Sequence, residues 1–299
     1  MDDNPYLHFV TRYQKLVQNG KGLPTQGVTP LVLPPLLSGA PKALIASPHP
    51  DDECLVGALP MRLRREQCTE VINLAVTLGM KKGKERLTER ARRTRELSGA
   101  CKYLGIRLII AGNGRGLRDV YLTTRKHAPD TWHRMVTEVA EQVQALQPSF
   151  IFMPHEHEAH PDHVGTHYLV MDALAKLPHD FSCIIFNTEF WQPNPTPNLM
   201  IGSSAQDVAE LITALAFHVG EVKRNPYHLE LPAWMHDNVR RGAELVGGWG
   251  SPAPDLIFAT LYQAQKWSNG HLTQILNKGK IIPPTASLGF LIQAEDKTG

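Results

Sequence analysis

Two short apolar runs, residues 43–46 and 150–153, are each followed by a cluster of imidazoles and carboxylates. Runs of this length that alternate with helical patterns are typical of buried parallel strands in an α/β sheet. The loops at the carboxyl ends of such strands converge on one edge, where ligands of open α/β sheets bind. The sequence therefore predicts an α/β fold in which the two clusters form one site.

The residue types in the two clusters indicate a metal site. The first cluster reads His49-Pro50-Asp51-Asp52-Glu53, and the second contains His155, His157, His160, Asp162 and His163. Imidazole nitrogens and carboxylate oxygens are ordinary zinc ligands. A His and an Asp three residues apart in a turning loop can face one ion, while the carboxylate between them stays free. With this spacing Asp52 can be a ligand and Asp51 a base.

The two clusters resemble the signature motifs of the PIG-L/LmbE-like zinc-dependent N-deacetylases, in the segments His49-Pro50-Asp51-Asp52-Glu53 and His160-Pro161-Asp162-His163. Residues 93–105 are similar to the helix between those motifs, and the similarity extends from about residue 41 to 175. The resemblance implies a three-layer Rossmann-like fold with a mostly parallel sheet. It also implies a hydrolase that removes an acetyl group from an amino sugar or sugar conjugate, such as an N-acetylglucosamine derivative, by means of a zinc-activated water.

The resemblance also implies a role for each matched residue. His49, Asp52 and His163 would bind zinc, Asp51 would be the general base, and His160 would stabilise the transition state. Arg93 would hold polar groups of the substrate. Asp162 would orient an imidazole, although the sequence does not show which one. A His-Asp-His site also accepts Fe²⁺ or another divalent ion.

This interpretation includes a protonated His160. A neighbouring carboxylate such as Asp162 would raise the pKa of His160 and leave it charged at neutral pH. A bell-shaped dependence of catalytic efficiency on pH would follow.

Other interpretations of the same residues remain open. Asp52 and Glu53 also suit the N-terminus of a helix, because acids there complement the helix dipole. His155 and His157 are more typical of residues that line a site or contact solvent than of metal ligands. His167, one helical turn after His163, is the weaker alternative ligand. Two other functions are a two-metal phosphoesterase-type hydrolase and a non-catalytic sugar-binding module.

Composition limits the remaining possibilities. The chain has 299 residues, 42% of them hydrophobic, and a net charge of +2. This size suits one large α/β domain with an extension, and the small charge argues against a nucleic-acid partner, as do the acids that interrupt the basic run 81–95. No apolar stretch is long enough for a membrane span, and no secretory signal begins the sequence, so we expect a cytoplasmic location with reduced cysteines. The oligomeric state is left open, and a homo-oligomer is compatible with the sequence.

The pattern along the chain predicts three regions. Residues 1–40 form an N-terminal extension, with an amphipathic helix over 6–18 packed on the outside of the core and a proline-rich connector; residues 41–280 form the deacetylase domain; residues 281–299 form a C-terminal tail. Loops 112–124 and 190–204 face the substrate, but Asp119 and Trp191 within them are more often structural residues. Further strands are expected at 71–76, 107–111, 182–186 and 256–261, and further helices at 86–104, 131–146 and 164–176.

Overall fold

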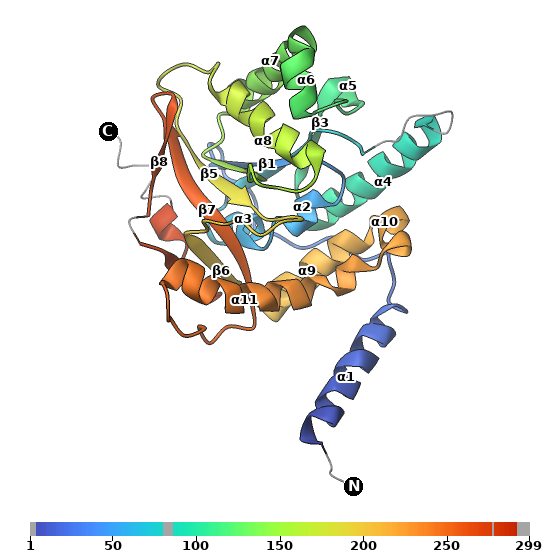
Figure 1. Ribbon diagram of the computed structural model, residues 1–299. Coiled ribbons are helices and arrows are strands. Elements are labelled where there is room, and N and C mark those ends of the chain that lie inside the picture. The colour runs from blue at the N-terminus through green and yellow to red at the C-terminus, as the bar shows by residue number, and fades with distance from the viewer. Residues whose placement is uncertain (1–3, 80–85, 277, 292–299) are drawn as a thin grey trace.

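A computed structural model describes residues 4–79, 86–276 and 278–291. Figure 1 shows a central sheet with helices on both sides. The strands are β1 (Lys42–Ser47), β2 (Glu70–Ala75), β3 (Arg107–Ile110), β4 (Phe150–Pro154), β5 (Cys183–Thr188), β6 (Leu199–Ser203), β7 (Phe258–Ser268), β8 (His271–Gln274) and β9 (Lys280–Ile282). The helices are α1 (Pro5–Gly20), α2 (Asp52–Leu55), α3 (Leu59–Glu66), α4 (Arg86–Leu104), α5 (Ala111–Gly114), α6 (Leu122–His127), α7 (Pro129–Leu146), α8 (Pro161–Leu174), α9 (Ala205–Ala216), α10 (Val219–Arg224) and α11 (Leu231–Gly247), with a 3-10 turn η1 (Tyr227–Leu229).

The sheet is mostly parallel, as the sequence predicted. Its order is β3-β2-β1-β4-β5-β7-β6-β9, with β8 paired to β7. The first five strands in that order run parallel to one another, whereas β7 runs antiparallel to β5, β6 and β8. In the antiparallel half only β7 was predicted; β8 and β9 are short, and β6 lies within the segment 190–204, which was expected to be a loop.

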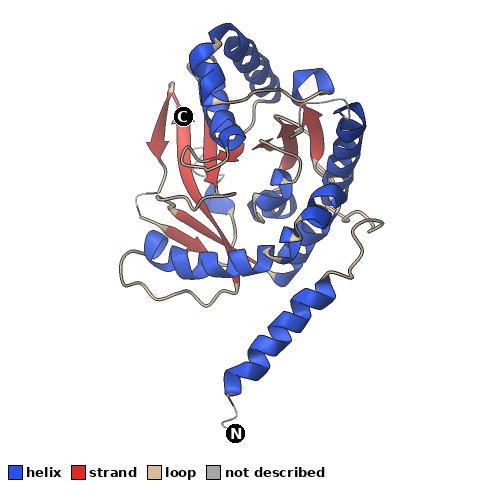
Figure 2. Cartoon of the chain, turned by 45° about the vertical axis from the view of Figure 1, so that its right-hand side comes forward, coloured by secondary structure: helices blue, strands red, loops and turns tan. Residues whose placement is uncertain are grey.

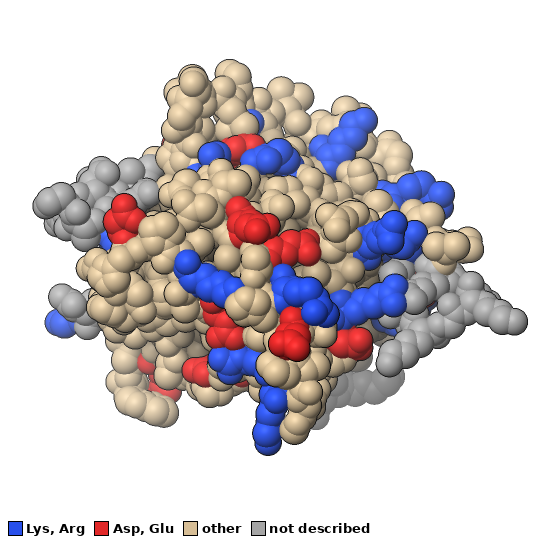
Figure 3. Space-filling view, turned by 90° about the horizontal axis from the view of Figure 1, so that it is seen from above, with Lys and Arg blue, Asp and Glu red and all other residues tan. Residues whose placement is uncertain are grey.

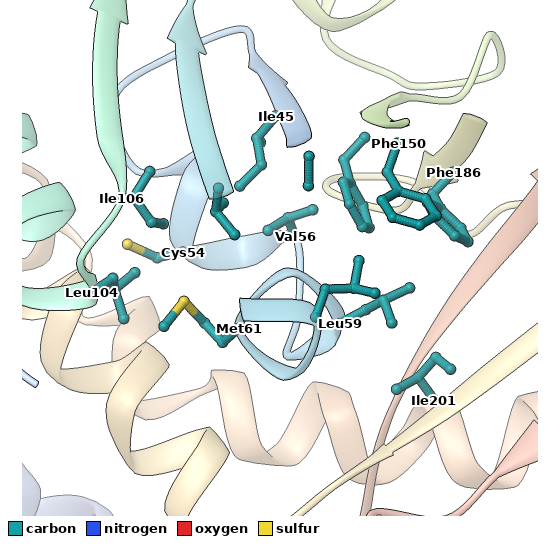
Figure 4. Close-up of a cluster of buried hydrophobic side chains, with 14 of the residues drawn as sticks. Ile45, Cys54, Val56, Leu59, Met61, Leu104, Ile106, Phe150, Phe186 and Ile201 are labelled. Carbon is teal, nitrogen blue, oxygen red and sulfur yellow. The ribbon is translucent and has the colours of Figure 1, made fainter. Parts of the chain in front are cut away.

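Alternate residues of the strands feed two separate cores, which makes three layers. Ala43 and Ile45 of β1 pack into one core with α3, α4 and α9. Leu44 and Ala46 pack into the other with α7 and α8. Figure 4 shows part of the first core, in which the segment after β1 packs beside aromatic side chains of β4 and β5. Both faces of the sheet are therefore covered, as a parallel sheet requires.

The position of β1 explains why the two motif loops meet. From β1 the chain adds β2 and then β3 on one side, and later adds β4 and then β5 on the other. The strand order reverses at β1, and the loops that follow β1 and β4 border the reversal point. This is the place where open α/β sheets bind ligands. The expected strands 43–46 and 150–153 are thus direct neighbours in the sheet.

The N-terminal helix differs from its prediction. Helix α1 forms, with the side chain of Asn4 accepting the N–H of Tyr6 at 3.0 Å, but none of its residues is buried. It stands away from the body in both views (Figures 1 and 2). The expected packing on the outside of the core is therefore wrong. An amphipathic pattern predicts an apolar face on the helix, but it does not identify the surface against which that face packs.

The surface and the C-terminal residues bear on the other expectations. On the face shown in Figure 3, basic and acidic side chains are interspersed. No described helix has the length and apolarity needed to cross a bilayer. Residues 280–282 pair with β6, and Leu288 and Leu291 are fully buried, so residues 281–291 belong to the packed body. Residues 81–85 of the basic run 81–95 lie outside the described residues.

Candidate active site

The loop after β1 presents its three polar side chains differently. Asp52 turns back, and its Oδ2 accepts the backbone N–H of His49 at 2.8 Å. Asp51 between them has a φ of 114°, in the left-handed region that a non-glycine residue rarely adopts. Such strain persists only where the surroundings hold it, and it is concentrated at functional sites. The Asp51 carboxylate has a partner of its own, the Tyr227 hydroxyl, apart from the hydrogen bond between Asp52 and His49.

Glu53 holds the strained backbone of Asp51. Its Oε2 accepts the Asp51 N–H at 2.9 Å, and its Oε1 lies 2.7 Å from Nε2 of His218. Burial opposes the charges, but the imidazolium of His218 lowers the pKa of Glu53, and the Glu53 carboxylate raises the pKa of His218. The pair is fully buried, so Glu53 is more than an acid that favours a helix terminus. Cys54 completes a buried Glu53-Cys54-His218 cluster, which is already paired internally.

The loop after β4 delivers its residues at the start of α8. His160 is the N-cap, and its Nδ1 accepts the backbone N–H of Asp162 at 3.3 Å. His163 is completely buried. Asp162 Oδ2 lies 2.9 Å from His49 Nε2 but 3.8 Å from His160 Nδ1. Because a carboxylate only accepts a hydrogen bond, the proton of His49 lies on Nε2. The unprotonated Nδ1 of His49 then faces His163 Nε2 and Asp52 Oδ2. The imidazole that Asp162 orients is therefore that of His49.

Three atoms that could coordinate a metal ion, which we call the donor triangle, lie close together. His163 Nε2 is 3.2 Å from His49 Nδ1 and 3.5 Å from Asp52 Oδ2, and the latter two atoms are 3.7 Å apart. Ligands of tetrahedral zinc at 2.0–2.1 Å lie about 3.3–3.4 Å from one another. The donor set and spacing thus fit a zinc ion. The nitrogens of His49, His160 and His163 also lie within 4.8 Å of one another, a looser group than the triangle.

The protonation of His163 suits a ligand. Burial, with the nearby charges of His49 and His160, lowers the pKa of His163 to about 2. The imidazole is therefore neutral, as metal binding requires. Burial and the charge of Asp51 raise the pKa of Asp52 well above its ordinary value. Burial thus disfavours the ionised form of Asp52, and a bound cation would stabilise that form.

The expected charge on His160 is not supported. Burial and the charge of His49 lower the pKa of His160, and Asp162 opposes this only weakly. The expectation failed because Asp162 is committed to His49, while its backbone N–H occupies the Nδ1 lone pair of His160. A neutral His160 then carries its proton on Nε2.

Sequence reasoning missed the partner of Asp51. Tyr227, from η1, donates its hydroxyl to Asp51 Oδ2 at 2.6 Å. Burial raises the pKa of Asp51 above the ordinary value, opposed by the charge of His218 and by the Tyr227 hydrogen bond. No signal in the sequence placed either residue here, because both lie on a segment that reaches the site only through tertiary packing.

The other three histidines that were considered as ligands, His155, His157 and His167, lie outside the triangle formed by the atoms of His49, Asp52 and His163. His155 is buried, with Nε2 2.9 Å from the carbonyl oxygen of Gln192, and the side chain of His157 is exposed. His167 places Nδ1 2.8 Å from the carbonyl oxygen of Pro154. All three positions agree with their weaker ranking as ligands.

A cavity of about 690 Å³ opens over the donor atoms. Its wall includes Arg93, whose Nη2 lies 2.6 Å from Glu221 Oε1, so this arginine borders the space as expected but is also tied to an acid. Arg118, Asp119 and Trp191 line the cavity too. Volumes of about 300–1,000 Å³ are typical of small-molecule sites.

Trp191 is held at the mouth of this cavity by a buried carboxylate. Glu158 accepts the backbone N–H of Phe190 at 2.7 Å and that of Trp191 at 3.1 Å. Its Oε2 also lies 3.8 Å from Nδ1 of His163. The Trp191 residue itself is 65% exposed. Glu158 thus holds the backbone of Trp191, and the exposed aromatic side chain borders the cavity, where it can contact a ligand.

Comparisons with known proteins cover the segment that carries both motif loops. Residues 44–174 match the family model PIG-L, described as GlcNAc-PI de-N-acetylase. The comparison with curated proteins found no match.

Three solved structures share the fold. A conserved protein from Thermus thermophilus is 22% identical, with a TM-score of 0.55, over 74% of this chain and 92% of that one. The N,N'-diacetylchitobiose deacetylase from Pyrococcus horikoshii is 16% identical, with a TM-score of 0.55, over 88% and 94%. The 4-carboxy-2-hydroxymuconate hydratase GalB from Pseudomonas putida is 16% identical, with a TM-score of 0.52, over 75% and 95%. The fold therefore occurs with more than one chemistry.

Both motif loops, the helix between them and the start of α8 lie inside the matched segment, which confirms the resemblance drawn from the motifs. Residues 44–174 of the chain are thus similar to the PIG-L family.

Proposed function

We propose that the protein removes an acetyl group from the nitrogen of an amino sugar or amino-sugar conjugate by metal-dependent hydrolysis, with zinc as the metal. The observation that carries the proposal is a division of labour within the two loops. His49, Asp52 and His163 gather three donor atoms in a triangle, while Asp51 and His160 stay outside it. Binding alone requires no free acid–base group beside the donors, which argues against a sugar-binding module.

The donor set determines what a metal would contribute. A zinc ion held by His49, Asp52 and His163 supplies a Lewis acid that activates water and polarises the amide carbonyl. The hydrogen bond from His49 Nε2–H to Asp162 Oδ2 fixes the His49 tautomer that this requires. The described site offers one such triangle, which favours a single ion over the paired ions of phosphoesterase-type hydrolases.

Asp51 is the proposed proton carrier. Its Oδ2 is occupied by the Tyr227 hydroxyl, so Oδ1 is the atom that takes a proton from water and returns it to the departing amine. Burial raises the pKa of Asp51, which makes it a stronger base than an exposed carboxylate. The hydrogen bond from the Asp51 N–H to Glu53 holds the backbone of Asp51, whose carboxylate lines the cavity.

His160 is the proposed donor to the developing oxyanion. Since its Nδ1 accepts the Asp162 N–H, its Nε2–H is available to the substrate. A neutral imidazole stabilises an oxyanion by hydrogen bonding, without a full charge. The alkaline limb of the pH profile then does not report His160.

The test is acetate release by the purified full chain from N-acetylglucosamine and N,N'-diacetylchitobiose. We expect about one divalent ion per chain by elemental analysis. Chelation should remove both the ion and the activity, and zinc should restore both. Two tightly held ions per chain would favour the two-metal hydrolase, and sugar binding without acetate release would favour the binding module.

Trp191 gives a test of how the substrate is held. Replacing Trp191 with Ala should raise KM for the disaccharide by about threefold to tenfold, because stacking on an aromatic ring is worth about 0.5–1.5 kcal/mol, and should leave kcat nearly unchanged. Trp249→Ala is the matched control, since Trp249 is 91% exposed and does not line the cavity. Equal KM values for the two variants would remove Trp191 from the substrate site.

A further inference from the structure

Glu158 is a buried carboxylate between the donor triangle and the aromatic side of the cavity. It follows β4, in the loop that leads to α8. Its side chain has no exposed surface, and it is absent from the cavity lining. Any effect of Glu158 on function must therefore pass through the residues that it contacts.

On one side Glu158 holds the aromatic wall of the cavity, which we define as Phe190 and Trp191. Its Oε1 accepts the backbone N–H of Phe190 at 2.7 Å and that of Trp191 at 3.1 Å. Its Oε2 also lies 3.1 Å from the Trp191 nitrogen. Both residues line the cavity. The backbone of this wall is thus tied to one carboxylate.

On the other side Glu158 faces His163, a member of the donor triangle. Its Oε2 lies 3.8 Å from His163 Nδ1, which is too long for a hydrogen bond. This Nδ1 is buried and has no hydrogen-bond partner among the described residues. The ring of Phe190 also packs edge-on against the His163 imidazole, with the ring centroids 5.1 Å apart. The carboxylate and the aromatic wall therefore adjoin the same imidazole.

The tautomer of His163 determines whether it can bind a metal ion. Its Nε2 belongs to the donor triangle, and a ring nitrogen that coordinates an ion carries no proton. A neutral imidazole has one ring proton, so the coordinating form of His163 carries it on Nδ1, on the side of Glu158. A carboxylate stabilises an N–H that faces it and repels a bare nitrogen lone pair. Glu158 therefore favours the coordinating tautomer.

His49 shows a comparable arrangement. Its Nδ1 belongs to the donor triangle, and its Nε2 donates to Asp162 Oδ2 at 2.9 Å. Each imidazole of the triangle thus has a carboxylate beside its second nitrogen, as metal-binding imidazoles usually do. The two carboxylates differ in one respect. Asp162 itself lines the cavity, whereas Glu158 reaches the cavity only through the backbone of the aromatic wall.

We propose that Glu158 is a positioning residue with two roles. It selects the metal-binding tautomer of His163, and the same carboxylate holds the aromatic wall in place against the cavity. This assignment rests on the proposed function, in which His163 binds the ion. Zinc affinity and substrate affinity then depend on one side chain that contacts neither the ion nor the substrate.

Glu158→Gln separates the two roles. The two backbone N–H groups of the aromatic wall attract the amide oxygen, so the amide NH₂ faces His163. This NH₂ donates to Nδ1 and favours the tautomer with its proton on Nε2, which cannot coordinate. We expect zinc affinity to fall about 10–100-fold, the range typical of residues that orient a ligand, and KM at saturating zinc to stay within about twofold. Competition with a chelator of known affinity measures the first effect, and initial rates measure the second.

Glu158→Ala removes both roles. Zinc affinity should fall as in the glutamine variant. In addition, KM at saturating zinc should rise by about threefold to tenfold, as in Trp191→Ala, because the aromatic side chain is no longer held in place to stack on the sugar. The double variant Glu158→Ala/Trp191→Ala should have about the KM of Trp191→Ala alone, since Glu158 acts on the substrate through Trp191. A general loss of structure would instead make the two effects on KM add.

Glu156→Gln is the matched control. Glu156 lies two residues earlier in the same loop, and its exposed side chain accepts the Tyr168 hydroxyl at 3.1 Å. Its replacement should change neither zinc affinity nor KM. A Glu158→Gln protein that binds zinc as tightly as the wild type would overturn the role in the tautomer, and an unchanged KM in Glu158→Ala would overturn the role in the wall. A wild-type chain that binds no zinc would instead overturn the proposed function, and this assignment with it.

Discussion

Asp51→Asn is expected to lower the rate of acetate release by about 10²–10⁴, the range typical of general acid–base groups, while the protein keeps its metal. Asparagine has the size of aspartate and tolerates a positive φ, so the loop should keep its shape. The N–H bond to Glu53 is unaffected because it comes from the backbone. The measurement is kcat, with metal content determined on the same sample.

Asp237→Asn provides the control for this prediction. Asp237 is a half-buried aspartate paired with Arg240 and Arg241, away from the cavity lining. Its variant should retain full activity. An Asp51→Asn protein that loses its ion would place Asp51 among the ligands, and one with more than about a tenth of the original rate would remove it from proton transfer.

His163→Ala should instead empty the site. Loss of a partner that only orients a ligand typically weakens metal affinity by 10–100-fold, so loss of a ligand should exceed about 100-fold. Activity at limiting zinc should fall with the metal content. Competition with a chelator of known affinity measures the first effect, and acetate release measures the second.

His167→Ala is the matched control, one turn further along α8. His167 is buried too, but its Nδ1 faces the carbonyl oxygen of Pro154 and not the donor triangle. Its replacement should reduce thermal stability and leave metal affinity unchanged. If His167→Ala released the ion and His163→Ala retained it, the ligand assignment on this helix would be wrong.

The sequence predicted the part of the molecule where local pattern and short motifs carry the information. Strands β1 and β4 stood out as apolar runs, and α4 has the predicted bounds of 86–104. The loops after those strands were expected to meet, because parallel strands end at one edge. The sheet order, with β1 and β4 adjacent, realises this expectation.

The remainder depends on contacts between segments far apart in the sequence. Tyr227 and His218 reach the first motif from the α9–α11 region, and their separations from Asp51 and Glu53 are 176 and 165 residues. No local pattern specifies such a contact. The choice of His49 as the partner of Asp162, and the consequent neutrality of His160, required atomic positions as well. The prediction that α1 packs on the core failed for another reason. An amphipathic pattern indicates that one face of the helix is apolar, but it does not indicate what that face packs against.

The position of the donor triangle across the sheet has a mechanical consequence. His49 and His163 are 114 residues apart in the chain and follow neighbouring strands. An ion bound there would act as a cross-link that fastens the first half of the sheet to the second at its centre. Because ligands that bind only the folded state stabilise it by mass action, the ion would raise the resistance to unfolding of the whole sheet. The same atoms that would serve the chemistry would then also brace the fold against opening between β1 and β4.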